Sequence, residues 1–361
     1  MTVAVADEKL VWAASKADIM NLGATIRVNK LGLGTIITVL AMIVMLYRYG
    51  NTATLERKPA MVSLKSMLSA AIDAAQRGGR IVYQVREAAD MHEKSKGKTK
   101  EGANEPVTDG DLKSHLTMFY SLKKAFPGVD IISEEHDTGS VDVSSVMPAS
   151  TFNMEVSSII TDDILVPIHD IRVWIDPLDA TQEYTENLRE YVTTMVCVAL
   201  RGYATIGVIH KPFSNFTAWG WAGKGVSSEL QMSVPQGGPK DDIPQIIVSR
   251  SHAGDVEGFS KAAFGERTKV IPAGGAGYKT LAVIQGDVDA YVHVTLIKKW
   301  DICAGNALLN ALHGNMTTLD GLSIDYSSRE DYKNEGGVLA TLYLHKNYLP
   351  KLQELRKKKP H

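Results

Sequence analysis

The pattern of apolar and polar positions separates one apolar segment near the start from a long mixed region. Residues 31–47 read LGLGTIITVLAMIVMLY and carry no charge, which is short but sufficient for a membrane-spanning helix. A buried core helix is the alternative, because shorter apolar stretches usually pack inside proteins. A cleaved signal peptide fits less well, since thirty residues precede the run. We expect an N-terminal tail at 1–30, a transmembrane signal anchor at 31–47 and a polar stem at 48–59.

The charges around this segment leave its orientation open. Three basic residues precede it (Lys16, Arg27 and Lys30) and three follow it (Arg48, Arg57 and Lys58), so the positive-inside rule gives a tie. Two glycosylation sequons lie downstream, at Asn215 and Asn315. They are usable only in a lumen, although such triplets are frequent by chance.

The first part of the remaining chain is mainly helical. Apolar residues at helical spacing predict a long helix over 61–91, and a second amphipathic helix is predicted over 111–126. Between them, 92–106 is rich in lysine and glycine and is predicted to be a mobile loop. A strand follows at 129–133, and 134–170 is irregular with a short helix.

The second part of the chain alternates between strands and short helices. Apolar runs bounded by turn signals predict strands over 172–176, 192–200, 203–210, 246–249, 288–294 and 338–344. Helical stretches are predicted over 280–284 and 303–312. This interleaving without strict alternation favours an α+β or layered α/β fold. We divide it into an N-terminal lobe at 60–200 and a C-terminal lobe at 201–361.

Composition narrows the function classes. The 361 residues include 39 basic and 41 acidic side chains, for a net charge of −2. That balance argues against a nucleic-acid-binding protein with a basic surface. There are only two cysteines, Cys197 and Cys303, too few for a disulfide framework or a four-cysteine zinc site, so we expect two free thiols.

Two aspartates, Asp176 and Asp179, follow a predicted strand and stand three residues apart. Proteins with α/β folds bind ligands at the carboxyl ends of strands. The two carboxylates and the Leu178 carbonyl offer oxygen ligands without His or Cys, a set that suits Mg²⁺. Taken alone, such a motif is more often an ordinary turn stabilised by aspartate.

Three further acidic sites stand at the ends of predicted elements. Glu134 and Glu135 end a strand, Asp111 begins a helix, and Asp301 begins another. Each has a simpler explanation, namely helix capping for the two aspartates and a solvated charge pair for the glutamates. Together, the four acidic sites predict one multi-metal centre.

Four segments carry these residues: EPVTDGD at 105–111, SEE at 133–135, WIDPLDATQE at 174–183 and WDICAG at 300–305. In this order and spacing they resemble the inositol monophosphatase superfamily of magnesium-dependent, lithium-sensitive phosphomonoesterases. The resemblance runs from about Leu64 to the C-terminus. It implies a layered α-β-α-β-α sandwich of the sugar-phosphatase type, here preceded by one N-terminal transmembrane helix.

The resemblance also implies roles for the acidic residues. Glu134, Asp176 and the Leu178 carbonyl match the ligands of one Mg²⁺, and Asp176 would bridge to a second ion held by Asp179 and Asp301. Asp111 matches the base that, with the hydroxyl of Thr181, orients the attacking water. Two or three Mg²⁺ ions would be bound. Metal-activated water needs no covalent nucleophile.

The expected substrate contacts are Ser249, His252, Gly275 and Lys279, in segments that resemble those of nucleotide phosphatases. The glycines around Gly275 permit close backbone approach to an anion, although an ordinary loop also explains them. Soluble yeast-type nucleotidases have a serine at the position of Ala276 and an arginine near that of His293. These differences concern the 5′-phosphate contacts rather than catalysis.

Within the superfamily, the VTDGD form and the N-terminal anchor are most similar to a Golgi branch acting on adenosine bisphosphate. We therefore expect hydrolysis of the 3′-phosphate of adenosine 3′,5′-bisphosphate to AMP and phosphate, in support of sulfation. The chain would be a single-pass type II Golgi membrane protein with a lumenal catalytic domain, and a homodimer stays open. Two alternatives are an inositol monophosphatase acting on myo-inositol phosphates and a catalytically inactive membrane scaffold.

Overall fold

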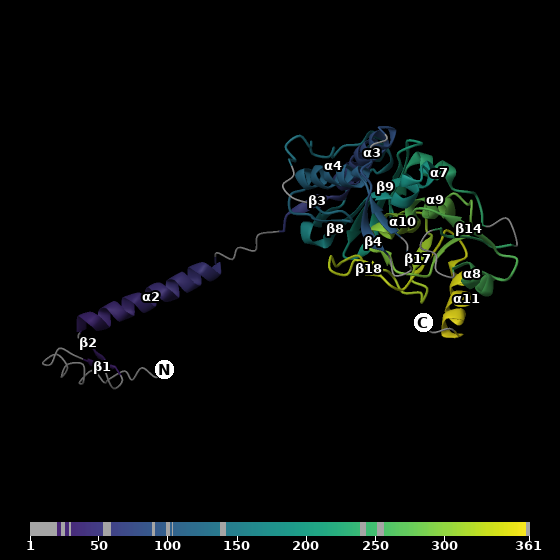
Figure 1. Ribbon diagram of the computed structural model, residues 1–361. Helices are drawn as coiled ribbons and strands as arrows, with labels where there is room; N and C mark the ends of the chain where they lie inside the picture. The colour runs from purple at the N-terminus through teal and green to yellow at the C-terminus, as the bar shows by residue number, and fades with distance from the viewer. Residues whose placement is uncertain are drawn as a thin grey trace. The chain divides into compact units, whose positions relative to one another are not determined.

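The computed structural model describes residues 20–22, 26–28, 30–52, 59–88, 91–98, 102, 104–137, 142–238, 243–250 and 256–358. The chain divides into two compact units, Met1–Pro59 and Ala60–His361 (Figure 1). The division falls at the end of the predicted stem.

The first unit contains the predicted anchor segment. A short antiparallel pair, β1 (Met20–Leu22) and β2 (Ile26–Val28), precedes the helix α2 (Lys30–Thr52). Large apolar side chains of α2 such as Leu40 and Ile43 are exposed. Among the described residues, no helix combines the length and the apolar character that crossing a membrane requires.

The second unit is built around a six-stranded sheet. The strand order is β12-β11-β10-β9-β8-β6, and only β6 and β8 pair in parallel. The strands are β6 (Asp130–Ser133), β8 (Ile171–Asp179), β9 (Thr193–Leu200), β10 (Tyr203–Lys211), β11 (Phe216–Trp221) and β12 (Gly225–Val226). The sheet runs across residue 200, because β9 and β10 are paired neighbours. The predicted division into lobes at that residue stays a prediction.

A second sheet has five strands in the order β14-β13-β15-β19-β17. They are β13 (Gln245–Ser249), β14 (Lys269–Ala273), β15 (Ala290–His293), β17 (Asn315–Thr317) and β19 (Val338–Thr341). Strand β13 pairs in parallel with β14 and β15, whereas β19 is antiparallel to β15 and β17.

Helices form three layers around the two sheets. The outer pair α3 (Leu64–Glu87) and α4 (Asp109–Ala125) packs on the six-stranded sheet, and α8 (Val256–Phe264) and α11 (His345–Lys358) pack on the five-stranded sheet. Between the sheets lie α9 (Ala276–Ile284) and α10 (Lys299–Ala311) (Figure 1). The unit is therefore the predicted α-β-α-β-α sandwich.

The sequence of strand β9 is almost continuously apolar because both faces of the strand are covered. Met195 and Cys197 face the core under α9 and α10, while Val196 and Val198 face the core under α3 and α4. Successive side chains of a strand point to opposite faces, so a strand covered on both sides needs apolar residues at every position. Gly207 on β10 lets α10 approach closely, because a Cβ there would lie 2.3 Å from the Ala304 carbonyl oxygen.

The remaining short elements connect these layers or lie at their edges. They are β3 (Met61–Ser63), β4 (Lys94–Lys98), β5 (Asn104–Val107), α5 (Met154–Ile159), β7 (Leu165–Pro167), the 3₁₀ helices η2 (Ile168–Asp170) and η3 (Arg189–Tyr191), α6 (Thr181–Thr185), α7 (Ser228–Ser233), β16 (Ile297–Lys298) and β18 (Lys333–Asn334). The short helix expected within 134–170 is α5.

The expectation of a mobile loop at 92–106 is wrong. There β4 and β5 form an antiparallel hairpin, with Lys94 opposite Val107. All five residues of β4 are exposed. A strand without a buried face has no apolar alternation, so the pattern that normally reveals a strand is missing from its sequence.

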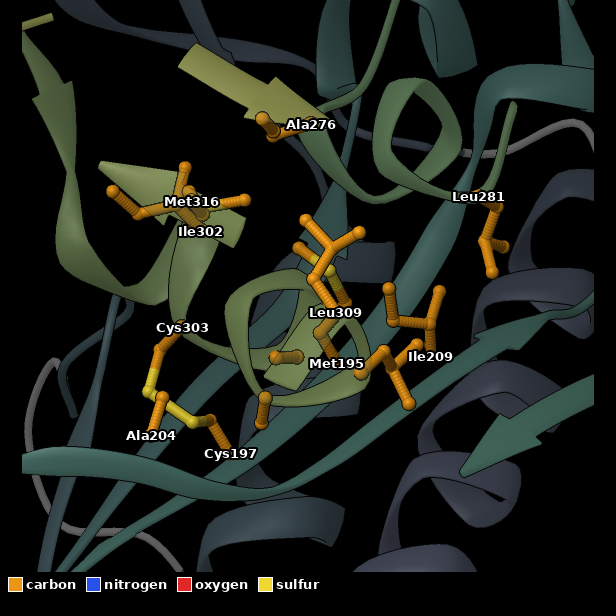
Figure 2. Packing of buried hydrophobic residues seen from close by; sticks show 14 of the residues in the cluster. Met195, Cys197, Ala204, Ile209, Ala276, Leu281, Ile302, Cys303, Leu309 and Met316 are labelled. Carbon is orange, nitrogen blue, oxygen red and sulfur yellow. A yellow bond between two sulfur atoms is a disulfide. The ribbon is translucent and has the colours of Figure 1, made fainter. Parts of the chain in front are cut away.

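The expectation of free thiols is also wrong. Cys197 on β9 and Cys303 on α10 form a disulfide across 106 positions, with their Cα atoms 5.6 Å apart (Figure 2). Both residues are buried where α10 packs against β9. The sequence conceals this pairing, because only the tertiary packing of α10 brings the two positions together.

Candidate active site

A cavity of about 870 Å³ lies where the carboxyl ends of β6 and β8 meet the first turns of α9 and α10. Because β6 and β8 are parallel and in register, with Ser133 opposite Ile175, their ends lie side by side. This arrangement brings the acidic residues that follow β6 and close β8 to one wall. The predicted site residues that line it are Glu134, Asp176, Leu178, Asp179, Thr181, Ser249, Gly275, Lys279 and Asp301.

Three carboxylates of this wall converge. Glu134, Asp176 and Asp301 each present an oxygen within 4.8 Å of the other two. Glu134 is held by its backbone N–H, which donates to the Ile175 carbonyl oxygen at 3.1 Å. Asp301 lies in the first turn of α10, where its Oδ2 accepts the Lys298 N–H at 3.1 Å.

The electrostatics of this cluster favour a bound cation. Burial, and then repulsion from Glu134 and the other nearby carboxylates, raises the pKa of Asp176 well above its ordinary value. The pKa of Asp301 is raised well above its ordinary value for the same two reasons. Buried carboxylates are normally paired with a cation or bound to a metal. Three converging oxygen donors without His or Cys fit a hard divalent ion.

Asp179 stands beside this cluster on β8, after an irregularity in its pairing with β9. Its Oδ2 accepts the Gly277 N–H at 2.8 Å and the Thr193 hydroxyl at 3.2 Å. Burial raises the pKa of Asp179, although Lys279 acts in the opposite direction. The protein thus fixes one oxygen of this carboxylate by hydrogen bonds.

The Leu178 carbonyl lies between the two aspartates and accepts the Thr181 hydroxyl at 3.2 Å. The Leu178 N–H donates to Asp176 Oδ1 at 3.1 Å. The turn that closes β8 therefore holds Asp176, the Leu178 carbonyl and Thr181 by its own hydrogen bonds. This local network explains how a contiguous sequence motif supplies several groups of one site.

Asp111 comes from the first turn of α4, on another element. Its Oδ2 accepts the Thr108 N–H at 2.7 Å and the Thr108 hydroxyl at 2.6 Å, which also caps the helix. Its Oδ1 accepts the Thr181 hydroxyl at 2.9 Å. Burial is the main reason why the pKa of Asp111 is raised to about 7. The structure thus brings the two predicted catalytic residues into direct contact.

The predicted substrate contacts are less closely grouped. Lys279 is buried beneath the cavity, and its ammonium donates to the Gly275 carbonyl at 2.6 Å and to the Ala273 carbonyl at 3.4 Å. Burial lowers the pKa of Lys279 to about 8 despite the nearby Asp179. Ser249, at the end of β13, lines the cavity. His252 lies outside the described residues.

The structure adds Lys96 to the site. From the β4–β5 hairpin, the Lys96 ammonium donates to Glu134 Oε1 at 3.0 Å and also pairs with Glu135. The Lys96 side chain is only 28% exposed, and this partial burial alone would lower its pKa, but the two carboxylates outweigh that effect and raise the pKa. The sequence pattern predicted a loop at Lys96, so this contact was not expected. The fully polar segment KSKGK has no apolar alternation that could have revealed the strand.

Comparison with known sequences identifies the family. The sequence pattern of the inositol monophosphatase family matches residues 63–358. The chain is 49% identical over 319 residues to the rat Golgi-resident adenosine 3′,5′-bisphosphate 3′-phosphatase, covering 85% of this chain and 86% of the relative. It is 49% identical over 292 residues to inositol monophosphatase 3 of zebrafish, covering 79% and 83%. It is 44% identical over 349 residues to the putative inositol monophosphatase 3 of Drosophila melanogaster, covering 94% and 97%.

Solved structures agree with this result at the level of the fold. The extragenic suppressor protein suhB of Bartonella henselae has a TM-score of 0.58 at 17% identity, over 81% of this chain and 99% of that one. The inositol monophosphatase of Anabaena has a TM-score of 0.54 at 20% identity, over 81% and 96%. With the sequence pattern matched along nearly all of the second unit, the chain belongs to the inositol monophosphatase family.

Proposed function

We propose that the chain is a Mg²⁺-dependent, lithium-sensitive phosphomonoesterase that converts adenosine 3′,5′-bisphosphate into AMP and phosphate. One observation carries the catalytic part of the proposal: Glu134, Asp176 and Asp301 converge in the cavity that also contains Thr181. The nucleotide part rests on the 49% identity to the rat adenosine 3′,5′-bisphosphate 3′-phosphatase.

The residues that would hold metal follow from the donor set. Glu134, Asp176 and the Leu178 carbonyl would bind one Mg²⁺, and Asp176 would be shared with a second ion held by Asp179 and Asp301. Two or three ions would be present in total. When bound, they supply positive charge to the phosphate oxygens and lower the pKa of water.

Asp111 and Thr181 position the attacking water. The Thr181 hydroxyl shares its one hydrogen between Asp111 Oδ1, the nearer acceptor at 2.9 Å, and the Leu178 carbonyl oxygen at 3.2 Å, so a lone pair of the hydroxyl oxygen remains to accept a hydrogen bond from water. Thr108 donates twice to the other oxygen of Asp111 and keeps the carboxylate from rotating. Asp111 receives the proton of the attacking water through Thr181. The bond between phosphorus and the 3′-oxygen of the ribose breaks as the new phosphorus–oxygen bond forms. The 3′-oxygen leaves with the electron pair of that bond and takes a proton from a solvent water, which gives the 3′-hydroxyl of AMP.

Ser249, His252, Gly275 and Lys279 would contact the nucleotide. Lys279 is a positive charge beneath the glycine turn that begins α9, and Gly275 has φ 63°, a conformation that favours glycine. The ammonium holds the Gly275 carbonyl, so the turn keeps its shape beside the cavity. An anion approaching this turn would meet both a positive charge and accessible backbone.

We also propose a single-pass type II protein of the Golgi membrane, anchored by residues 31–47 with its catalytic unit in the lumen. The relatives named Golgi-resident support the compartment. The Cys197–Cys303 disulfide supports the lumen, since disulfides persist in oxidising compartments and are rare in the cytosol. Association as a homodimer stays open. The nearly equal numbers of basic and acidic side chains argue against a nucleic-acid partner.

The second candidate substrate is a myo-inositol phosphate. The zebrafish and Drosophila relatives named inositol monophosphatase 3 favour it. The third candidate, a catalytically inactive scaffold, is disfavoured by the presence of every acidic residue that the family's motifs require. Both alternatives keep the fold and differ in which phosphate ester, if any, is cleaved.

One assay separates the three candidates. Phosphate release by the full chain in detergent is measured with adenosine 3′,5′-bisphosphate and with myo-inositol 1-phosphate, with and without Mg²⁺. We expect Mg²⁺-dependent release that is faster from the bisphosphate, and inhibition by lithium. Faster release from the inositol phosphate would favour the second candidate, and no release from either would favour the scaffold.

A further inference from the structure

Two lysines stand directly opposite each other at one edge of the cavity. In the β16–β18 pair, Lys298 is the cross-strand partner of Lys333, and both residues line the cavity. Side chains of directly opposite residues lie on the same face of a strand pair, and like charges there destabilise it. The pair therefore needs a compensating negative charge close to both ammonium groups.

Neighbouring basic residues are paired with carboxylates, whereas the positive charges of Lys298 and Lys333 are less completely neutralised. Arg329 is bound to Asp130, and Lys299 pairs with Asp331 at 2.8 Å. Lys298 has one carboxylate, Glu105, at 3.7 Å. For Lys333, the described part of the chain shows no ion pair, and its ammonium lies 5.5 Å from the ring centre of Tyr332.

The strand pair is rigidly connected to the metal cluster. Trp300 and Tyr332 stack with their ring centres 5.2 Å apart and their planes inclined by 8°, which ties the start of α10 to the segment before β18. Lys298 is the residue that caps α10, and its N–H donates to Asp301 Oδ2. The two ammonium groups are thus held on the same side of the cavity as a predicted metal ligand.

We propose that Lys298 and Lys333 bind the phosphate group of the substrate that is not cleaved. This inference rests on the proposed function, because only a substrate with a second phosphate brings that charge. The cleaved phosphate belongs at the carboxylate cluster, where metal ions neutralise it. A second phosphate lies beyond the reach of those ions and needs cations of its own, and two lysines act as point charges toward its oxygens.

The test compares two substrates that differ only in the second phosphate. Adenosine 3′,5′-bisphosphate and adenosine 3′-monophosphate are assayed with the full chain, Lys333→Gln, Lys298→Gln and the double variant. Each single substitution should raise KM for the bisphosphate about 10-fold and change KM for the monophosphate less than about 2-fold. Added salt should raise the bisphosphate KM more for the wild type than for the double variant, since screening weakens charge pairs.

Lys269→Gln is the matched control. Lys269 is an exposed lysine on β14 and does not line the cavity, so its loss removes the same charge without removing the site. Lys333→Arg should restore most of the affinity lost in Lys333→Gln, because it restores the charge. Equal KM changes for both substrates, or a Lys269→Gln effect as large as that of Lys333→Gln, would overturn the proposal.

A binding measurement separates this proposal from the proposed function. Adenosine 5′-monophosphate retains the second phosphate, and its affinity is measured by calorimetry with Mg²⁺, with adenosine as the comparison ligand. We expect Lys333→Gln to weaken the monophosphate about 10-fold and adenosine hardly at all. If the full chain releases no phosphate from either substrate but shows this pattern, the activity is wrong and the phosphate site stands. If hydrolysis occurs and neither KM nor binding separates the variants, the phosphate site is wrong and the activity stands.

Discussion

Two walls of the same cavity differ in how their functional groups are held. The metal wall consists of Glu134, Asp176, Asp179, Thr181 and Asp301, at the ends of β6 and β8 and in the first turns of α6 and α10, and Asp111 is buried against Thr181. The recognition wall consists of Ser249, Lys279, Lys298 and Lys333, at the ends of β13, α9 and two strands of two residues each.

Hydrogen bonds fix the metal wall more completely than they fix the side chains of Lys298 and Lys333 on the recognition wall. Asp111 accepts three hydrogen bonds from two threonines, and the turn after β8 is bound to itself through Leu178. On the recognition wall, Lys333 has a ring contact but no ion pair within the described residues. The difference indicates that the catalytic groups are fixed by the core of the sandwich, whereas the groups that recognise the substrate lie at its edges. Substitutions on the metal wall should therefore change turnover, and those on the recognition wall should change affinity.

The largest effect is expected for Asp176→Asn on the metal wall. Asp176 would be shared by two ions, so loss of its charge should lower kcat about 1000-fold, close to 4 kcal/mol of transition-state stabilisation. Without metal, the variant should unfold at a higher temperature than the wild type, because one charge leaves a crowded buried cluster. Kinetics at saturating Mg²⁺ and calorimetry in chelator test the two parts.

Asp162→Asn is the control for this experiment, since Asp162 is an exposed aspartate away from the cavity. It should change neither turnover nor melting temperature. An Asp176→Asn protein with near-normal kcat would show that the acidic cluster is structural and would remove the distinction between the walls.

The second effect concerns the Cys197–Cys303 disulfide, which anchors the helix that carries Asp301. The disulfide joins β9 to α10, which has Asp301 in its first turn, and it closes a segment of 106 residues. Replacing both cysteines by alanine should lower the free energy of unfolding by about 2–5 kcal/mol, since the denatured chain regains the entropy that the bond removes. Urea denaturation of the oxidised wild type and the double variant measures this. Reductant added during unfolding should destabilise the wild type alone, and equal stability of the two proteins would contradict the expectation.

The third effect isolates a single hydroxyl of the metal wall. Thr181→Val keeps the branched shape but leaves Asp111 Oδ1 without its 2.9 Å hydrogen bond and the water without an acceptor. We expect kcat to fall about 100-fold with a small change in KM. Thr181→Ser should keep most of the activity.

Thr185→Val, on the same helix α6, is the control, because the Thr185 hydroxyl donates to the Gln182 carbonyl oxygen within the helix turn. A serine variant as impaired as the valine variant would argue against the role of the hydroxyl.

The contrast between the walls also explains what the sequence could predict. Asp176, Leu178, Asp179 and Thr181 lie within six consecutive positions at the end of β8, so local rules place them together. Glu134 follows β6, and the parallel pairing of β6 with β8 brings it beside these residues. Predicting its position requires only that these two strands are neighbours in the sheet. The interleaved strands and helices predicted an α+β or layered α/β fold, and the resemblance to the inositol monophosphatase superfamily implied the layered sandwich.

Non-local pairing accounts for what was missed. The opposition of Lys298 and Lys333 depends on strands of two residues, too short to leave a pattern in the sequence. The β4–β5 hairpin has no buried face on β4, and the disulfide depends on how α10 packs on β9. In each case the partners are decided by tertiary packing.

The smallest effect is expected for Lys279→Met, and it bears most directly on the comparison, because Lys279 belongs to the recognition wall but is buried beneath it like a core residue. Its ammonium lies 5.1 Å from the ring centre of Tyr291 and holds the Gly275 carbonyl at 2.6 Å. Methionine fills a similar volume without the charge, so the fold should survive while the attraction for an anion is lost. We expect KM for adenosine 3′,5′-bisphosphate to rise about 10-fold, with a smaller change in kcat and little change for a minimal phosphomonoester.

Lys211→Met is the control, since Lys211 is a partly buried lysine on β10 that contacts an aromatic ring, Tyr278, outside the cavity lining. If Lys279→Met lowers activity on both substrates equally, Lys279 supports the turn before α9 and the position of Asp179, and it belongs with the metal wall instead.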